Sequence, residues 1–338
     1  MIGFYSLQEI LMITALAIIV DLLIGDPKRL PHPVIWIGKL IKFLTNRWLN
    51  PLLSLPPVER QRHQRKEKQL GIALLVTVAL SVFIVTVAGA WACAWIHPWL
   101  GYAFQVWFIS TTMAVKGLKD AGVLVFDALD RGRLHDARTY VGYIVGRDTM
   151  HLDEPEITRA AVETVAENTV DAYVTPLCFA LLGGAPLAML YRAVNTLDSM
   201  VGYRNEKYRH FGWASARCDD VLNYIPARLT GLLMVLSNIF LPGSSAGRSL
   251  RAILKFARLH PSPNGGIPES AAAGALGVQL GGINVYGEVV SDRARMGWKL
   301  RELRSPDILA VIRMLYGTAY LTLGGILCAL CWIMFAGS

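Results

Sequence analysis

The stretch from residue 70 to residue 115 contains no Asp, Glu, Lys or Arg. Such a stretch argues against a soluble fold, because about 20 apolar residues already cross a lipid bilayer. His97 and Pro98 interrupt it, and Trp and Tyr residues gather around them as they do at a membrane–water interface. The pattern therefore predicts two membrane spans, near residues 70–96 and 99–115.

The rest of the chain has the same character. Of its 338 residues, 54% are hydrophobic and 17% are charged, whereas roughly 25% are charged in an average soluble protein. Apolar runs at 7–25 and 308–335 predict two further spans, and the segments 172–191 and 229–241 predict short or re-entrant ones. We therefore expect an all-α, polytopic integral membrane protein with about four to six membrane-embedded helices. Because we see no linker-like boundary, we predict one integral membrane domain over 1–338, with a polar helical region on the cytoplasmic side.

The basic residues indicate the orientation in the membrane. Between residues 26 and 68 there are ten Lys or Arg against three Asp or Glu. The positive-inside rule places this loop in the cytoplasm, and we expect both termini outside. The run 59–68 within it is interpreted as a solvated turn that faces the membrane. The net charge of +8 is explained by this topology, and we expect no nucleic-acid partner.

Acids at helical spacing mark the centre of the chain. Glu163, Glu167 and Asp171 are four residues apart, with Asn168 beside them, so their side chains would share one helix face. Like charges at this spacing repel each other, and a cation is expected to offset them. Arg159 is one candidate, and a divalent metal that carries phosphate is the other.

Acid, amide and arginine recur together further along the chain. Arg192, Asn195 and Asp198 repeat the pattern, and Asp219, Asp220 and Asn223 repeat it again. Beside apolar, Gly-rich helices this recurrence favours a wet cleft over a solvated face, although each acid alone would equally suit a buried ion pair. The Pro- and Gly-rich loop 260–268 then leads into a helix of small residues that Glu269 opens. A loop that leads into a helix N-terminus is a candidate anion site.

Four separate blocks, in order, carry a resemblance that covers nearly the whole chain. The chain resembles the CbiB/CobD family of cobalamin biosynthesis, which are membrane-bound adenosylcobinamide-phosphate synthases. The blocks are GDPKRLPHPVIWIGKLI, RAAVETVAENTVDAYVTPL, YRAVNTLDSMVGYRNEKYRHFGWASARCDDVLNYIPARLTG and HPSPNGGIPESAAAGALGVQLGG.

The resemblance implies an ATP-dependent amide ligation. A carboxyl group of adenosylcobyric acid is joined to (R)-1-aminopropan-2-ol or to its O-phosphate, and the sequence does not distinguish the two amines. ATP and Mg²⁺ are the implied co-substrate and cofactor. The implied setting is the inner membrane of the cell with the active site on the cytoplasmic side. The expected partners are the corrinoid and amine substrates, the bilayer and other membrane enzymes of the corrinoid pathway.

Roles for individual residues follow from the resemblance together with their chemistry. Carboxylate and amide oxygens suit a Mg²⁺–phosphate centre, for which we expect Glu163, Glu167, Asn168, Asp171 and Asp198. Catalytic roles are expected for Glu163, Glu167, Asp171 and His260. Substrate binding is expected for Asp26, His32, Arg147, Arg192, Asn195, Arg217, Asp219, Arg228, Ser262, Asn264 and Glu269.

Two other classes of membrane protein suit the residues themselves. A Mg²⁺-dependent intramembrane transferase that acts on prenyl or alcohol phosphates also uses acid- and amide-rich helices, although the spacing from Glu163 to Asp171 is not its paired D-x-x-x-D signature. A transporter is the third class. The acids gather toward one predicted face and no inverted repeat is visible, which favours an enzyme over a transporter.

Overall fold

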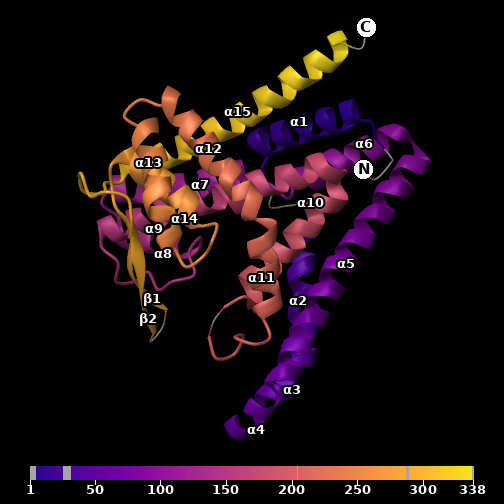
Figure 1. Ribbon diagram of the computed structural model, residues 1–338, viewed down its shortest axis with the longest axis horizontal. Helices are drawn as coiled ribbons and strands as arrows, with labels where there is room; N and C mark the ends of the chain where they lie inside the picture. Colours follow the sequence, from indigo (N-terminus) through magenta and orange to yellow (C-terminus); the bar gives the residue numbers. More distant parts are fainter. Residues whose placement is uncertain (1–4, 26–31, 204, 287–288, 337–338) are drawn as a thin grey trace. The chain divides into compact units, whose positions relative to one another are not determined.

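The chain packs as two compact units. The computed structural model describes residues 5–25, 32–203, 205–286 and 289–336 (Figure 1). The first unit comprises Met1–Met113 and Thr175–Leu222, and the second comprises Ala114–Val174 and Asn223–Ser338. The boundary after Val174 falls inside continuous helical structure, which explains why no linker composition is visible there. The prediction of one membrane domain stays a prediction.

Helices are the only regular secondary structure in the described residues of the first unit. Its core joins buried side chains of three helices and one loop, including Ile41, Leu74, Leu197 and Phe211. The helices are α1 Leu7–Leu23, α2 Pro33–Trp48, α3 Asn50–Leu53, α4 Pro57–Arg62, α5 Gln64–Ile96, α6 Pro98–Ser110, α10 Thr175–Val201 and α11 Trp213–Leu222.

Helix α10 is broken where a re-entrant or short span is predicted for residues 172–191. Gly183 and Gly184 have non-helical backbone angles, and Gly184 has a φ of 67°. The freed Ala185 N–H donates to Gln105 Oε1 at 2.7 Å. Both glycines also line a small apolar cavity of about 200 Å³. The broken backbone is thus satisfied inside the protein, as irregular backbone at membrane depth requires.

The second unit is built around a helix of small residues. Every residue of α14, Gly266–Leu276, is buried, and a Cβ at Gly274 would lie 2.5 Å from the Arg248 carbonyl oxygen. The close packing expected of Ala- and Gly-rich helices is therefore confirmed. The other helices are α7 Val115–Asp130, α8 Leu134–Gly142, α9 Glu154–Thr169, the π turn η1 Val170–Val174, α12 Tyr224–Phe240, α13 Ala246–Phe256, the 3-10 turn η2 Ala257–Leu259 and α15 Pro306–Ala336.

The all-α prediction needs one correction, because the second unit contains a β-hairpin. Strands β1 Leu280–Tyr286 and β2 Val289–Met296 pair antiparallel. A register shift between Leu280 and Gly282 marks a bulge, and Gly281 has a φ of 80°. A Cβ there would lie 2.1 Å from the Ala294 carbonyl oxygen, so the close strand approach requires glycine.

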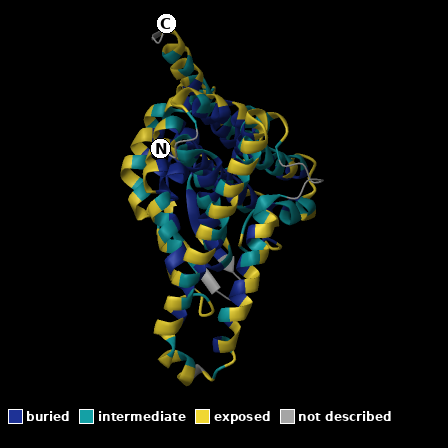
Figure 2. Cartoon of the chain, turned by 90° about the vertical axis from the view of Figure 1, so that its right-hand side faces the viewer, coloured by how far each residue is buried: buried dark blue, intermediate teal, exposed yellow. Residues whose placement is uncertain are grey.

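Three helices of the described chain are long and apolar enough to cross a membrane, namely Gln64–Ile96, Glu154–Val201 and Pro306–Phe335. The first and third match the predicted spans 70–96 and 308–335. Exposed residues run along α15 toward the C-terminus (Figure 2), and exposed apolar side chains such as Ile84 and Val85 on α5 suit contact with lipid. Helices α1, α6 and α12 have 17, 13 and 17 residues, so spans at 7–25, 99–115 and 229–241 stay predictions.

Candidate active site

Helix α9 presents Arg159, Glu163 and Glu167 to the hairpin and to the loop before α14. The helix begins with a capping box, in which Asp153 accepts from the Glu156 N–H at 2.9 Å. This cap fixes the start of the helix and hence which residues share a face. The Pro- and acid-rich sequence before residue 159 is therefore a helix start.

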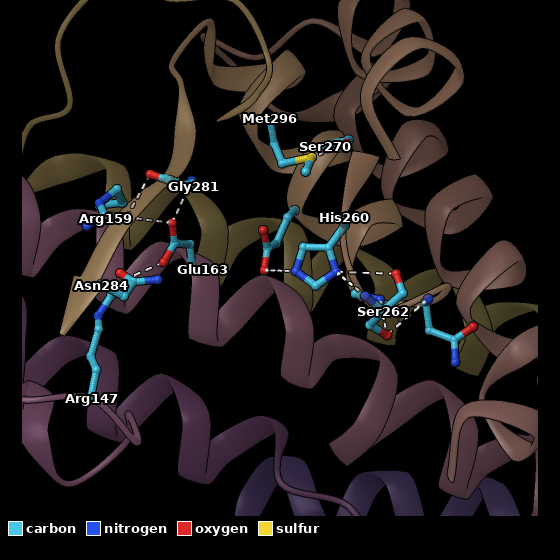
Figure 3. A network of polar contacts seen from close by, with 12 residues as sticks. Arg147, Arg159, Glu163, His260, Ser262, Ser270, Gly281, Asn284 and Met296 are labelled. Atoms are coloured by element: carbon cyan, nitrogen blue, oxygen red, sulfur yellow. Dashed lines mark hydrogen bonds and ion pairs between the residues drawn. The ribbon is translucent and has the colours of Figure 1, made fainter. Parts of the chain in front are cut away.

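Glu163 ties α9 to the hairpin. Its Oε1 accepts from the Gly281 N–H at 2.8 Å and lies 3.5 Å from Arg159 Nη1. Its Oε2 lies 3.1 Å from Arg147 Nη2, and Arg147 also donates to Asn284 Oδ1. Figure 3 shows this arrangement around Glu163. Arg159 thus supplies the offsetting cation expected from the spacing of the acids.

The two arginines beside Glu163 hold the backbone of β1 as well as the carboxylate. Arg159 donates to the carbonyl oxygens of Gly281 at 2.7 Å and Ile283 at 2.8 Å. The side chains of Arg147, Arg159 and Glu163 are 5%, 10% and 7% exposed. These contacts favour a structural role for Glu163, because a metal would have to displace two guanidinium groups from it. Its role as a metal ligand stays a prediction.

Glu167 lies one turn further along α9, against the loop before α14. A Cβ at Gly265 would be 3.3 Å from Glu167 Oε1 and 3.0 Å from His260 Cε1, so the two side chains flank the same glycine. Arg293 of β2 is close enough to Glu167 to attract its carboxylate. The next residues of the predicted metal set follow directly: Asn168 donates to the Thr164 carbonyl at 2.9 Å, and half-buried Asp171 lies in the π turn η1.

His260 and Glu269 form a buried pair. His260 Nε2 lies 3.6 Å from Glu269 Oε1, and the side chains are 5% and 1% exposed. These two atoms have no hydrogen-bond partner within the described part of the chain. The Ser262 N–H donates to His260 Nδ1 at 3.1 Å, so in the neutral imidazole the proton is assigned to Nε2, which faces the glutamate.

Burial sets the charge of this pair. Burial lowers the pKa of His260, and Arg293 lowers it further, while the backbone of Ser262 and the charge of Glu163 oppose the shift. Burial raises the pKa of Glu269 well above its ordinary value, and the charges of Glu163 and Glu167 add to this, against Arg293 and Arg147. The site therefore favours a neutral imidazole beside a protonated carboxyl.

The loop that carries His260 is held by its own polar residues. Ser262 Oγ accepts from the N–H groups of Asn264 at 3.2 Å and Gly265 at 3.3 Å. Arg228 donates to Asn264 Oδ1 at 3.0 Å and stacks over the Tyr224 ring at 3.5 Å. Ser262, Asn264 and Arg228, which we predicted as substrate-binding residues, thus shape the loop before α14.

Other predicted site residues lie in the first unit. Arg192 donates to Asn195 Oδ1 at 3.3 Å, and Asn195 donates to Asp219 Oδ1 at 3.3 Å. Asp198 lies against Gly202, where a Cβ would be 1.9 Å from its Oδ1. Arg192, Asn195 and Asp219 thus form a polar cluster in helices α10 and α11.

Two more predicted residues, Arg217 and His32, belong to the first unit. Arg217 is largely exposed and lies 3.5 Å from Asp220 Oδ2. His32 caps α2, where its Nδ1 accepts from the Val34 N–H at 3.2 Å. Asp26 lies outside the described residues.

Sequence reasoning missed Arg293 and Asn284, which the hairpin brings to the site. The available signal was the alternation of Arg293 and Arg295 with Ala294 and Met296, which is typical of a strand. Among the described residues, no group of three or more His, Cys, Asp or Glu side chains could hold a metal ion.

Fold and site together define a helical membrane protein whose second unit buries a cluster of arginines, carboxylates and one histidine. The chain belongs to the CobD/CbiB family, since the family model described as CobD/Cbib protein matches residues 14–315. The family resemblance found in the sequence is therefore confirmed.

Curated relatives cover nearly the same length. The chain is 48% identical to the cobalamin biosynthesis protein CobD of Halalkalibacterium halodurans, over 86% of this chain and 88% of the relative. It is 48% identical to CobD of Geobacter metallireducens, over 89% and 91%, and 44% identical to the cobalamin biosynthesis protein CbiB of Salmonella arizonae, over 94% and 97%. No solved structure matches the chain significantly.

Proposed function

We propose that this protein acts in cobalamin biosynthesis as an ATP-dependent amide ligase of the membrane. The carboxyl of adenosylcobyric acid would be phosphorylated by ATP, which releases ADP. The amino group of (R)-1-aminopropan-2-ol or of its O-phosphate would then displace phosphate to form the amide of adenosylcobinamide or its phosphate. Family membership supports the pathway, and the buried cluster of the second unit supports the chemistry.

The observation that carries the proposal is the His260–Glu269 pair beside Glu167 and Arg293. An amine loses a proton when it becomes an amide, and the departing phosphate can take that proton. The neutral His260–Glu269 pair, whose facing atoms have no other partner among the described residues, is suited to donate hydrogen bonds to the phosphate oxygens. Arg293 adds a positive charge beside the pair. Such a charge would stabilise the phosphate oxygens and the developing oxyanion.

Mg²⁺ would neutralise phosphate charge when it is bound. Glu167, Asn168 and Asp171 are the residues of α9 and η1 that we propose for it, since both oxygens of Glu163 already have partners. Mg²⁺ usually takes only one or two protein carboxylates and completes its shell with substrate phosphate and water. A site of this kind needs no group of three acidic side chains. Asp198 stays a prediction in the first unit.

We also propose that the protein lies in the inner membrane of the cell, with this cluster on the cytoplasmic side and both termini outside. The long apolar helices support a membrane location. The basic loop between residues 26 and 68 supports the orientation.

The direct test supplies purified protein with adenosylcobyric acid, ATP, Mg²⁺ and either amine, and identifies the product by mass spectrometry. We expect an amide product together with ADP, and ATP consumption only when both the corrinoid and an amine are present. Glu167→Gln and His260→Gln should each lower the rate about 100-fold or more. Glu302 is exposed and pairs with Lys299, so Glu302→Gln provides a control that should keep full activity. ATP consumption without the corrinoid, or product that forms normally in both site variants, would contradict the proposal.

A further inference from the structure

A second cavity of the first unit, which is polar, lies where the start of α5 meets the loop between α10 and α11. It has a volume of about 920 Å³. None of the residues expected to act in ligation lines it. Its lining residues are Leu53, Leu55, Arg60, Gln61, Gln64, Glu67, Asn205, Glu206, Lys207, Arg209 and His210. The run 59–68, predicted as a solvated turn, is mostly exposed but forms α4 and the start of α5, and Glu67 within it is only 1% exposed.

The walls of this cavity are fixed by specific contacts. Arg60 Nε donates to Glu67 Oε1 at 2.7 Å, and its Nη2 donates to the carbonyl oxygens of Glu206 at 3.0 Å and Lys207 at 3.2 Å. Phe211 next to the cavity is fully buried. A Cβ at Gly71 would lie 1.9 Å from the Phe211 carbonyl oxygen, so the loop is packed directly on α5.

The lining offers an acceptor for a ligand's hydrogen-bond donor, and cations for a ligand's negative charge. Glu67 Oε2 is buried and has no hydrogen-bond partner among the described residues. A buried carboxylate oxygen in this state is unfavourable unless a donor reaches it. Arg60 is already occupied by Glu67 and two carbonyls, which leaves Lys207 and Arg209 of the lining as exposed cations.

We propose that this cavity binds a phosphoester that carries an ammonium or hydroxyl group. The phosphate would contact Lys207 and Arg209, and the ammonium or hydroxyl would donate to Glu67 Oε2. The ligand could be a soluble phosphomonoester or the headgroup of a membrane phospholipid. The cavity lies at the N-terminal end of the candidate span Gln64–Ile96, where a membrane–water interface is expected, and Lys68 there lies 3.6 Å over the ring of Trp213.

The test measures binding to the full chain and does not depend on the ligase activity. The first arm titrates O-phosphoethanolamine into protein in nanodiscs of phosphatidylcholine, with ethyl phosphate as the analogue that lacks a donor. The second arm measures bound phosphatidylethanolamine by native mass spectrometry in mixed-lipid nanodiscs. Saturable binding in either arm that is weakened by Lys207→Ala/Arg209→Ala supports the site and identifies its source, and absence of such binding in both arms overturns it.

Matched variants separate this cavity from general charge attraction. The double variant Lys207→Ala/Arg209→Ala should weaken binding about tenfold or more, because it removes two charge-assisted contacts. The control is Arg65→Ala/Lys66→Ala, which removes the same charge from exposed residues of α5 outside the lining and should leave affinity within about twofold. Equal loss in both double variants overturns the site. Equal affinity for ethyl phosphate and O-phosphoethanolamine overturns the role given to Glu67.

Discussion

At the scale of single residues, the charge of the His260–Glu269 pair is decided by burial. A free glutamate is ionised above its ordinary pKa of 4.5, and a free histidine is ionised below 6.5. Burial in the fold shifts the pKa of each side chain so that its neutral form is favoured. Glu163, nearly three turns of helix away from the N-cap of α9, shows the opposite solution. Its carboxylate is surrounded by two guanidinium groups and a backbone N–H, which offset the cost of burying a charge.

This pair predicts how stability depends on pH. Glu269 keeps its proton in the fold above its ordinary pKa of 4.5, so its contribution falls as pH rises from that value toward the folded pKa. His260 resists protonation in the fold below 6.5, so its contribution falls as pH drops below that value. As the pH rises from about 5 to about 8, the Glu269→Gln variant should therefore lose less thermal stability than the unmodified protein. Thermal unfolding in detergent across this range measures it.

The control for this experiment is Glu302→Gln, because Glu302 is exposed and paired with Lys299. This variant should show the same pH dependence as the unmodified protein. A Glu269→Gln protein whose melting temperature falls as steeply with rising pH as the unmodified protein would contradict the assigned direction of the shift.

At the scale of elements, the sequence pattern predicted helices far better than it predicted the hairpin. Apolar runs and caps are local signals, so α5, α9 and α15 follow from them directly. The hairpin depends on a glycine bulge at Gly281 whose backbone N–H and carbonyl contact Glu163 and Arg159 of α9. These partners are more than a hundred residues away in sequence. The same reason explains why Arg293 was not among the predicted site residues, whereas Glu163, Glu167 and His260 were.

The break in α10 gives a prediction at this scale. Gly184 combines a φ of 67° with a position where a Cβ would lie 2.7 Å from Gln105 Oε1. Gly184→Ala should therefore strain the backbone and disturb the acceptor of the Ala185 N–H, and lower the free energy of unfolding by about 1–3 kcal/mol. Gly324→Ala is the matched control, because no atom lies within 4 Å of a Cβ at that position in α15. Unfolding in detergent compares the two, and equal stability of both variants would refute the strain at Gly184.

At the scale of the whole molecule, the composition of the chain indicates a membrane environment. The distribution of basic residues predicts which side of the membrane is cytoplasmic. Three helices of the described chain are able to cross a bilayer, and few charges lie within their apolar windows. The basic residues between 26 and 68 lie before and at the start of the first of these helices. Moving such a loop across the membrane during insertion is disfavoured, which is the basis of the positive-inside rule. The cavity beside Glu67 would then open toward the cytoplasm.

Labelling of single cysteines measures this orientation directly. In a variant whose five cysteines are replaced by serine or alanine, Arg65→Cys lies in the basic loop region, and Trp99→Cys lies at the turn between α5 and α6, where the native side chain is 74% exposed. Because α5 crosses the bilayer between them, the two sites should respond oppositely to a membrane-impermeant maleimide. We expect Trp99→Cys to react in cells whose inner membrane is intact, and Arg65→Cys to react only after that membrane is permeabilised. The reverse pattern would invert the topology and move the Glu67 cavity to the outer face, while equal labelling of both sites in intact cells would mean that α5 does not span the membrane.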